Sequence, residues 1–266
     1  MNNLAGKVVW ITGASSGIGE ALSYAFANKG AALVLSARRE AELIRVKNKC
    51  NGTSRVEILP IDLEDTAGFA EKAAWVITKM GEIDVLVNCA GVSQRSFASE
   101  TSVKVYRKIM EINYFGTLQL SLAVLPYFLK QNKGKIVAMS SVTGVRGLPL
   151  RTAYSAAKHA VEGFFGALRT ETWRTNVNIL MVRAGAVKTN IATNALTANG
   201  KTFNEKDPII ENGISAEACA QAIINAIIED KKEIMVGSFK EKLLMVINRF
   251  FPGVAFNLVK KLADKS

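Results

Sequence analysis

The chain alternates short apolar, β-branched runs with longer segments of helical period, and this pattern limits its fold more than any other feature. The apolar runs predict strands near residues 7–11, 32–37, 55–60, 84–88, 134–140, 177–183 and 233–236. The segments between them predict helices near residues 17–29, 39–49, 65–80, 102–131, 153–176 and 215–229. Because strands joined by helical crossovers form parallel sheets, we expect an α/β fold: a doubly wound parallel seven-stranded sheet with helices on both faces (Rossmann-type).

Two segments fall outside this alternation. Residues 186–214 are polar and rich in Asn, Thr and Gly, which predicts a mobile loop on the ligand side of the sheet. Residues 239–262 are apolar at helical spacing around a Phe-Phe-Pro-Gly sequence. Since no linker or repeat divides the chain, we expect one catalytic domain over residues 1–266. It would carry a substrate loop near 186–214 and a C-terminal helical tail near 239–266.

The net charge of +11 raises the question of a nucleic-acid partner. Much of the surplus lies in residues 38–55 and 239–266, each with six basic and two acidic side chains. Neither segment is a continuous basic run or carries a recognition-helix signature, so we expect no nucleic acid. The first segment suits an anionic cofactor and the second an acidic surface, although a solvated face is the commoner explanation of either.

Cysteine and histidine usage argues against metal chemistry. The three cysteines and the single histidine show no ligand spacing, so we expect no metal and no disulfide framework. No stretch approaches the roughly 20 apolar residues of a membrane span. The first apolar run is too short for a signal-peptide core, and we therefore expect a cytoplasmic protein.

A glycine-rich turn follows the first strand, where residues 12–19 read T-G-A-S-S-G-I-G. Such a turn before a helix lets the backbone approach a pyrophosphate, which predicts dinucleotide binding. Arg38 and Arg39 follow the second strand, with no acid before Glu40. A guanidinium pairs with a 2′-phosphate, which favours NADP(H); the alternative is that both arginines are surface residues.

Two further strand ends carry small or polar residues. Asp62 and Leu63 follow the third predicted strand, where an acid can hold an adenine amine. Asn88, Ala90 and Gly91 end the fourth, where small residues let backbone come close to a ribose. A helix cap or a strand-end turn explains either pattern equally well.

Tyr154 and Lys158 are four residues apart and so share one face of a predicted helix. An ammonium near a phenol favours the phenolate, so we expect Lys158 to lower the pKa of Tyr154. Small residues surround the pair and leave room for a ligand. Upstream, Ser140 and Ser141 end an apolar strand, where a hydroxyl can polarise a substrate oxygen.

Together these motifs resemble those of the short-chain dehydrogenase/reductase family, in the branch with subunits of roughly 250 residues. The resemblance covers about residues 5–236. Residues 12–19 match the family's T-G-x-x-x-G-x-G turn, residues 88–91 its N-N-A-G motif and residues 154–158 its Y-x-x-x-K motif. Ser141 and Asn113 fall where the family keeps a catalytic serine and a helical asparagine.

The resemblance implies an NADP(H)-dependent oxidoreductase that transfers a hydride between the cofactor and a carbonyl or secondary alcohol, with a hydrophobic ketone or aldehyde as the expected substrate. It implies that Tyr154 donates a proton, Ser141 binds the substrate oxygen, Lys158 holds the nicotinamide ribose and Asn113 anchors a proton-relaying water. The expected cofactor contacts are Gly13, Ser15, Ser16, Gly17, Ile18, Gly19, Arg38, Asp62, Leu63, Asn88, Ala90, Gly91, Tyr154, Lys158, Gly185, Val187 and Thr189.

Three positions depart from the family pattern. Ala184 replaces a proline after the sixth strand, which should loosen that turn. Cys89 replaces an asparagine, and we expect it to behave as a small buried hydrophobe. Ser16 stands where some NADP(H)-preferring members carry a basic residue, so the cofactor prediction depends on Arg38.

The substrate is not named by any motif. We expect its pocket to gather Ser93, Gln94, Phe97, Val142, Leu148, Ile191, Leu196 and Phe203. Two other functions fit the sequence: a cofactor-binding scaffold without turnover, and a membrane-surface lipid or sterol reductase. The family forms homodimers and homotetramers through its fourth and fifth helices, and we expect one of these states. The apolar tail fits a subunit interface or an anionic membrane, and we favour the interface.

Overall fold

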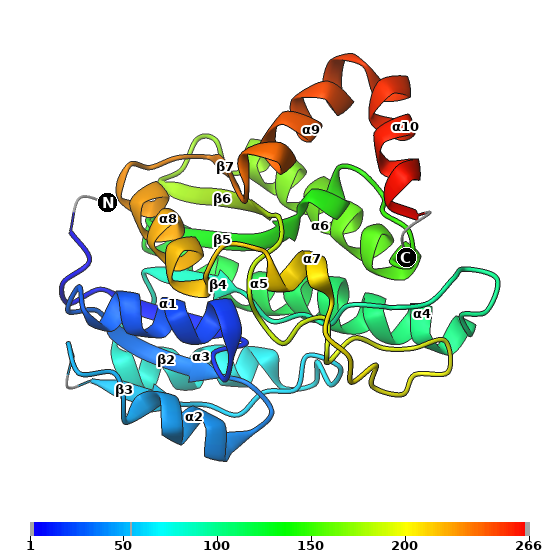
Figure 1. Cartoon of the computed structure of the whole chain (residues 1–266). Helices are drawn as coiled ribbons and strands as arrows, with labels where there is room; N and C mark the ends of the chain where they lie inside the picture. Colours follow the sequence, from blue (N-terminus) through cyan, green and yellow to red (C-terminus); the bar gives the residue numbers. More distant parts are fainter. Residues whose placement is uncertain (1–2, 54, 264–266) are drawn as a thin grey trace.

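The computed structural model describes residues 3–53 and 55–263, and in this part of the chain seven parallel strands form one sheet (Figure 1). The strands are β1 (Val8–Thr12), β2 (Ala32–Ser36), β3 (Val56–Ile58), β4 (Val85–Asn88), β5 (Gly134–Ser141), β6 (Val177–Ala184) and β7 (Glu233–Val236). Their order is β3-β2-β1-β4-β5-β6-β7. The order reverses between β1 and β4, and sheets of this type bind ligands at the carboxyl ends of the strands beside that point. The predicted fold class is confirmed.

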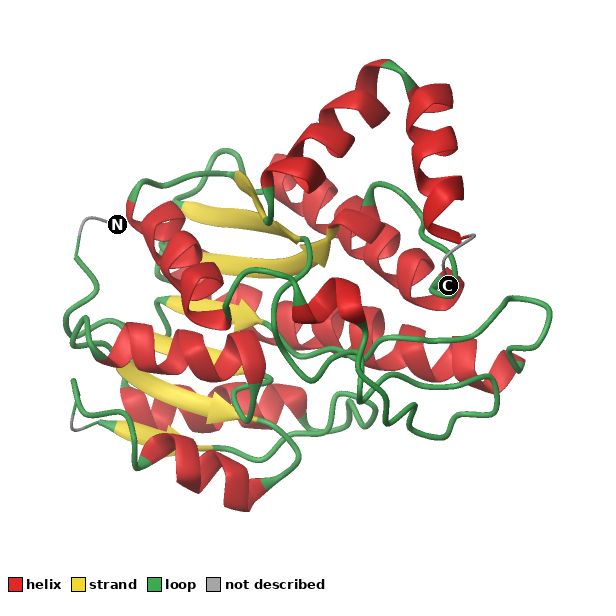
Figure 2. Cartoon of the chain, in the orientation of Figure 1, coloured by secondary structure: helices red, strands yellow, loops and turns green. Residues whose placement is uncertain are grey.

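Helices connect the strands as expected (Figure 2). They are α1 (Gly17–Ala27), α2 (Glu40–Lys47), α3 (Phe69–Met80), α4 (Val103–Met110), α5 (Gly116–Lys130), α6 (Thr152–Glu171), α7 (Pro208–Glu211), α8 (Ala216–Ile228), α9 (Phe239–Phe250) and α10 (Pro252–Ala263). A π-helical turn, η1 (Glu111–Phe115), joins α4 to α5, and a 3-10 turn, η2 (Val142–Gly144), follows β5.

Several predicted boundaries were wrong by a few residues. The helix expected from residue 65 begins at Phe69, because Gly68 before it takes a left-handed φ of 75°. The helix expected to reach residue 176 ends at Glu171. The strand expected over residues 55–60 has three residues, since it pairs only with β2 at the edge of the sheet. The segment 186–214 is not wholly loop, because it contains α7.

Side chains from the two faces of the sheet form two separate cores. One core joins alternate residues of β1, such as Val9 and Ile11, to α1, α2 and α8. The other joins Val8 and Trp10 of the same strand to α3, α5 and α6. Since successive residues of a strand point to opposite faces, each strand contributes to both cores. The sheet is therefore held rigidly between two helical layers, and its strand ends are fixed in place.

The helical segment Val103–Lys130 is long and apolar enough, by length and composition alone, to cross a bilayer, contrary to our expectation that no such stretch exists. Its inner face, however, carries the fully buried Leu120, Val124 and Phe128, which pack against the sheet. These contacts are those of a core helix in a layered α/β domain.

The C-terminal tail is helical, as predicted, and consists of the hairpin α9–α10, which projects from the rest of the domain (Figure 1). Ser238 and Glu241 form a capping box that starts α9. The chain turns at Phe251, and Pro252 opens α10. The last predicted tail residues, 264–266, lie outside the described residues.

Candidate active site

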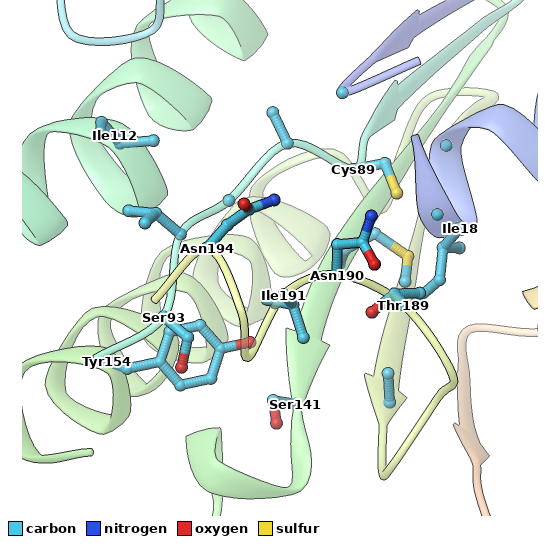
Figure 3. Close-up of a pocket in the computed structure, with 18 of the residues that line it drawn as sticks. Ile18, Cys89, Ser93, Ile112, Ser141, Tyr154, Thr189, Asn190, Ile191 and Asn194 are labelled. Atoms are coloured by element: carbon cyan, nitrogen blue, oxygen red, sulfur yellow. The ribbon is translucent and has the colours of Figure 1, made fainter. Parts of the chain in front are cut away.

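A cavity of about 660 Å³ lies at the carboxyl ends of the strands, beside the point where the strand order reverses. It extends from Arg38 after β2 to Tyr154 on α6, and the segment after β6 covers it. Figure 3 shows Tyr154 and Ser141 pointing into one part of it, with Ile191 beside them. Of the predicted site residues, these line the cavity: Gly13, Ser15, Ser16, Gly17, Ile18, Gly19, Arg38, Asp62, Leu63, Ala90, Gly91, Ser141, Tyr154, Lys158, Gly185, Val187 and Thr189.

The glycine-rich turn leaves room that any other residue would fill. Gly13 and Gly17 have left-handed φ values of 69° and 58°, which favour glycine. A Cβ on Gly13 would lie 2.7 Å from the backbone Cα of Ala90, so only glycine lets the loops after β1 and β4 meet. The turn leads into the N-terminus of α1, whose free N–H groups suit a pyrophosphate. These residues therefore fit a dinucleotide.

The end of the cavity at β2 is basic. Arg38 and Arg39 both line it and are exposed. Neither side chain makes a hydrogen bond or an ion pair within the described ranges. Arg45, by contrast, is held by Glu20 at 2.7 Å and by Glu42 at 2.8 Å. The first two guanidinium groups are thus available to an anionic ligand.

The Tyr154 phenol is buried in the cavity wall, with 9% of the residue exposed. Burial raises its pKa to about 12, although the Ser141 hydroxyl and the charge of Arg151 oppose the shift. Our expectation of a lowered pKa was wrong. Removing the charged phenolate from water raises the pKa by more than the neighbouring hydroxyl and cation lower it. Tyr154 is consequently protonated at neutral pH, which is the form that donates a proton.

Lys158 lies one helical turn further along α6 and is 4% exposed. Its Nζ donates a hydrogen bond of 2.7 Å to the carbonyl oxygen of Met139 and lies 5.6 Å from the centre of the Tyr154 ring. Burial lowers its pKa to about 8. Because the ammonium also lines the cavity, its remaining protons can reach a bound hydroxyl.

Two predicted residues, Asn88 and Asn113, do not reach the cavity wall. Asn88 is 2% exposed and donates to the Ser121 hydroxyl at 2.8 Å, so its predicted contact with the cofactor is not supported. Asn113, in the π-helical turn, is fully buried. Its amide accepts from the Val92 N–H at 2.9 Å and donates to the Val92 carbonyl at 2.8 Å. Asn113 therefore fixes the loop after β4, and its water-binding role stays a prediction.

The segment after β6 closes the cavity through specific contacts. Thr189 lies against Gly17, whose added Cβ would come within 3.0 Å of the threonine methyl group. Further along, Asp207 is 2% exposed and accepts hydrogen bonds from Arg95 at 2.7 Å and Arg151 at 2.6 Å. These contacts join the predicted substrate loop to the start of α6, three residues before Tyr154.

The substrate pocket was predicted only in part. Ser93, Val142, Leu148, Ile191 and Leu196 line the cavity. Gln94, Phe97 and Phe203 do not, and their assignment was wrong.

The three misplaced residues have other environments. Gln94 is fully buried, and its Oε1 accepts from the Ala153 N–H at 2.7 Å, so it holds the first turn of α6. Phe97 is 54% exposed, and Phe203 stacks with Arg95. These residues lie in loops, where no helical or strand periodicity predicts the direction of a side chain.

Two charged residues that line the cavity, Arg151 and Glu241, were missed. Arg151 lines the cavity and is charged beside Tyr154, but its partner Asp207 is 56 residues away. Glu241 of α9 also lines it and accepts from the Ala186 N–H at 2.6 Å. This bond holds the turn that Ala184 was expected to loosen. The Ser-x-x-Glu pattern at residues 238–241 was the readable signal for Glu241.

Cys89, which we expected to be a small buried hydrophobe, is half-buried and lines the cavity. Burial nevertheless raises the pKa of its thiol to about 12. It is therefore a neutral part of the wall at physiological pH and not a nucleophile.

Comparisons with known proteins agree with this geometry. A family model described as short chain dehydrogenase matches residues 7–200. A dehydrogenase/reductase SDR family protein 7-like from Anopheles gambiae is 38% identical over 99% of this chain and 85% of its own length. Dehydrogenase/reductase SDR family member 7 from Homo sapiens is 37% identical over 98% of this chain and 79% of its own length.

Solved structures of similar proteins have the same fold. A short chain dehydrogenase/reductase from Burkholderia phymatum in complex with NAD is 25% identical, with a TM-score of 0.80 over 88% of this chain and 90% of that one. An alcohol dehydrogenase from Thermococcus sibiricus complexed with 5-hydroxy-NADP is 26% identical, with a TM-score of 0.74 over 88% and 97% of the two chains.

The Asp207 contacts yield a stability prediction. Asp207→Asn removes the charge shared by Arg95 and Arg151, so we expect the free energy of unfolding in urea to fall by about 3 kcal/mol. The matched control is Glu211→Gln, which breaks the exposed pair with Lys206 and should cost less than about 0.5 kcal/mol. Equal effects of the two substitutions would contradict the role given to Asp207.

Proposed function

Because this chain belongs to the short-chain dehydrogenase/reductase family and is thus an oxidoreductase, we propose that it reduces a hydrophobic ketone or aldehyde with NADPH. The observation that carries the proposal is the protonated, buried Tyr154 phenol facing the same part of the cavity as the Ser141 hydroxyl. A neutral acid beside a second hydroxyl suits protonation of a carbonyl oxygen.

The nicotinamide cofactor, when bound, supplies the hydride that adds to the carbonyl carbon. Ser141 donates a hydrogen bond to the substrate oxygen and so favours the charge that develops there. Tyr154 passes its Oη proton to the same oxygen, which completes the alcohol. Lys158 is buried one turn away, and its positive charge favours the tyrosinate that remains. Asn113 holds the loop after β4 against this site.

The residues at β2 support NADP(H) as the cofactor. Arg38 and Arg39 line the cavity, whereas Glu40, the first acid after β2, does not. A carboxylate at the strand end would repel a 2′-phosphate, and a free guanidinium would bind it at two oxygens. The related structures contain both kinds of cofactor, NAD in one and a derivative of NADP in another, so this proposal depends on the arginines.

The lining of the substrate end supports a hydrophobic substrate. The wall near Tyr154 includes Val142, Leu148, Ile191 and Leu196, and Ile209 and Ile210 of α7 extend it. Apolar walls with a few placed polar groups are typical of sites for small hydrophobic molecules. The polar groups here include Ser141 and Tyr154, together with Ser93 and Asn194.

An apolar stripe that begins at the end of η1 and continues along α5 supports a homodimer or homotetramer. Phe115, Leu122 and Leu129 are spaced by seven residues, two helical turns, and are 39–45% exposed. A second copy packed along this stripe would cover it. We propose this helix, and not the tail, as the subunit contact.

The first test of this proposed function concerns turnover. Tyr154→Phe removes the proton donor, and we expect kcat for carbonyl reduction to fall by at least about 100-fold. The Kd for NADPH, measured by fluorescence titration, should stay within about twofold, since the ring remains. The control Tyr106→Phe removes a hydroxyl that bonds Thr152 outside the cavity and should leave kcat nearly unchanged.

Equal turnover of Tyr154→Phe and the unaltered protein would contradict the mechanism. If the unaltered protein binds NADPH but turns over no member of a ketone, aldehyde and alcohol panel, the non-catalytic scaffold is the better description.

The second test of this proposed function concerns the cofactor. Arg38→Ser should raise the Kd for NADPH by at least about tenfold, because charge-assisted hydrogen bonds to the 2′-phosphate are lost. The Kd for NADH should be unchanged. The control is Arg107→Ser on α4, an exposed arginine outside the cavity. Equal affinities of the unaltered protein for NADH and NADPH would refute the assignment.

A further inference from the structure

The outer surface of the α9–α10 hairpin is apolar to an extent that the active site does not explain. No side chain of α9 is buried. Large apolar side chains between 43% and 79% exposed are Phe239, Leu243, Val246, Phe250, Phe251, Val254, Phe256 and Leu258. Figure 1 shows the hairpin standing away from the sheet and its helices. Exposed apolar groups on this scale mark a contact with a partner or a membrane.

The exposed large apolar residues of α9 form one stripe, opposite the side that anchors the helix. Phe239, Leu243, Val246 and Phe250 are spaced by four, three and four residues, so they follow one helical face. On the opposite side, Glu241 accepts from the Ala186 N–H at 2.6 Å. From that side too, Asn248 accepts from Arg146 at 3.1 Å. These bonds fix the orientation of the helix, with its apolar stripe toward solvent.

Basic side chains flank this stripe on both sides. At 3.6 residues per turn, Lys240 falls on one side, and Lys242 and Arg249 fall on the other. All three are exposed, and none is paired with an acid among the residues described. Long basic side chains beside an apolar stripe are typical of helices that lie in the plane of an anionic bilayer, where each cation reaches the headgroups.

Charge also argues against a second copy of this chain as the partner. A two-fold contact through the hairpin would bring two identical stripes together, with their unpaired cations close to one another. Like charges facing each other across an interface weaken it. The stripe on α5 has no such flanking row and is better suited to self-association. We therefore infer that the α9–α10 hairpin docks the protein on an anionic membrane surface.

The position of the hairpin relates docking to the cavity. Glu241 belongs to α9 and also lines the cavity, so a docked hairpin lies beside it. Where the proposed function holds, an apolar substrate could then enter from the bilayer. Anionic lipids are concentrated in the cytoplasmic leaflet, which agrees with the cytoplasmic location expected from the sequence.

The test is co-sedimentation with sucrose-loaded vesicles. The full chain should bind vesicles of phosphatidylcholine with about 30 mol % phosphatidylserine and should not bind phosphatidylcholine alone. A triple variant, Lys240→Gln, Lys242→Gln and Arg249→Gln, should bind about 100-fold more weakly, since each basic residue near such a surface contributes about fivefold. The double variant Phe250→Ser and Phe251→Ser should also lose binding, because the apolar tip is removed.

A matched control separates a local effect from one of net charge. The variant Lys47→Gln, Lys79→Gln and Lys130→Gln removes three exposed, unpaired cations from α2, α3 and α5, and should bind within about twofold of the unaltered protein. Circular dichroism and NADPH affinity should be unchanged in every variant, which excludes misfolding.

Four results would overturn the inference. They are no vesicle binding by the full chain, equal binding to both kinds of vesicle, equal loss in the control variant, or dissociation of an oligomer by the tail substitutions in analytical ultracentrifugation. The last would make the hairpin a contact between copies. Because binding is measured without turnover, failure here leaves the proposed reaction untouched, and failure of turnover leaves the docking result standing.

Discussion

Burial of the Tyr154 phenol beside the Lys158 ammonium is the condition on which the chemistry of the cavity depends. Burial raises the pKa of the phenol to about 12 and lowers that of the ammonium to about 8, so at neutral pH the phenol keeps its proton and the ammonium keeps its charge. Contacts with neighbouring segments keep both side chains in place in the cavity wall. Gln94 holds the first turn of α6, the Met139 carbonyl accepts a hydrogen bond from Lys158, and the segment after β6 lines the cavity beside them.

Much of this could be predicted from the sequence, because the informative patterns are local. The strand and helix alternation determined the sheet, and parallel strands bring their carboxyl ends to one edge. For that reason the turn after Gly13, Arg38 after β2 and Ser141 after β5 all reach one cavity. The Tyr154 and Lys158 spacing needed only helical periodicity.

The remaining features depend on contacts between distant segments. Asp207 pairs with Arg95 and Arg151 across 112 and 56 residues, and no periodicity reveals such a pair. The direction of the pKa shift of Tyr154 was predicted wrongly. The sequence shows that a cation is near, but it does not show how deeply the phenol is buried. The hairpin also combines a local pattern with a distant contact. Its apolar helical spacing could be predicted from the sequence, whereas the outward direction of the stripe depends on how Glu241 anchors α9.

The most direct measurement is the titration of Tyr154 itself, followed by the NMR signal of a ¹³Cζ-tyrosine label that is assigned by its loss in Tyr154→Phe. In the cofactor-free protein we expect a pKa of about 12, set mainly by burial. Bound NADP⁺ should lower it by at least about one unit, because the positive nicotinamide favours a nearby phenolate. A pKa of about 10 or below without cofactor, or no change when NADP⁺ binds, would contradict the role given to the buried Tyr154 phenol.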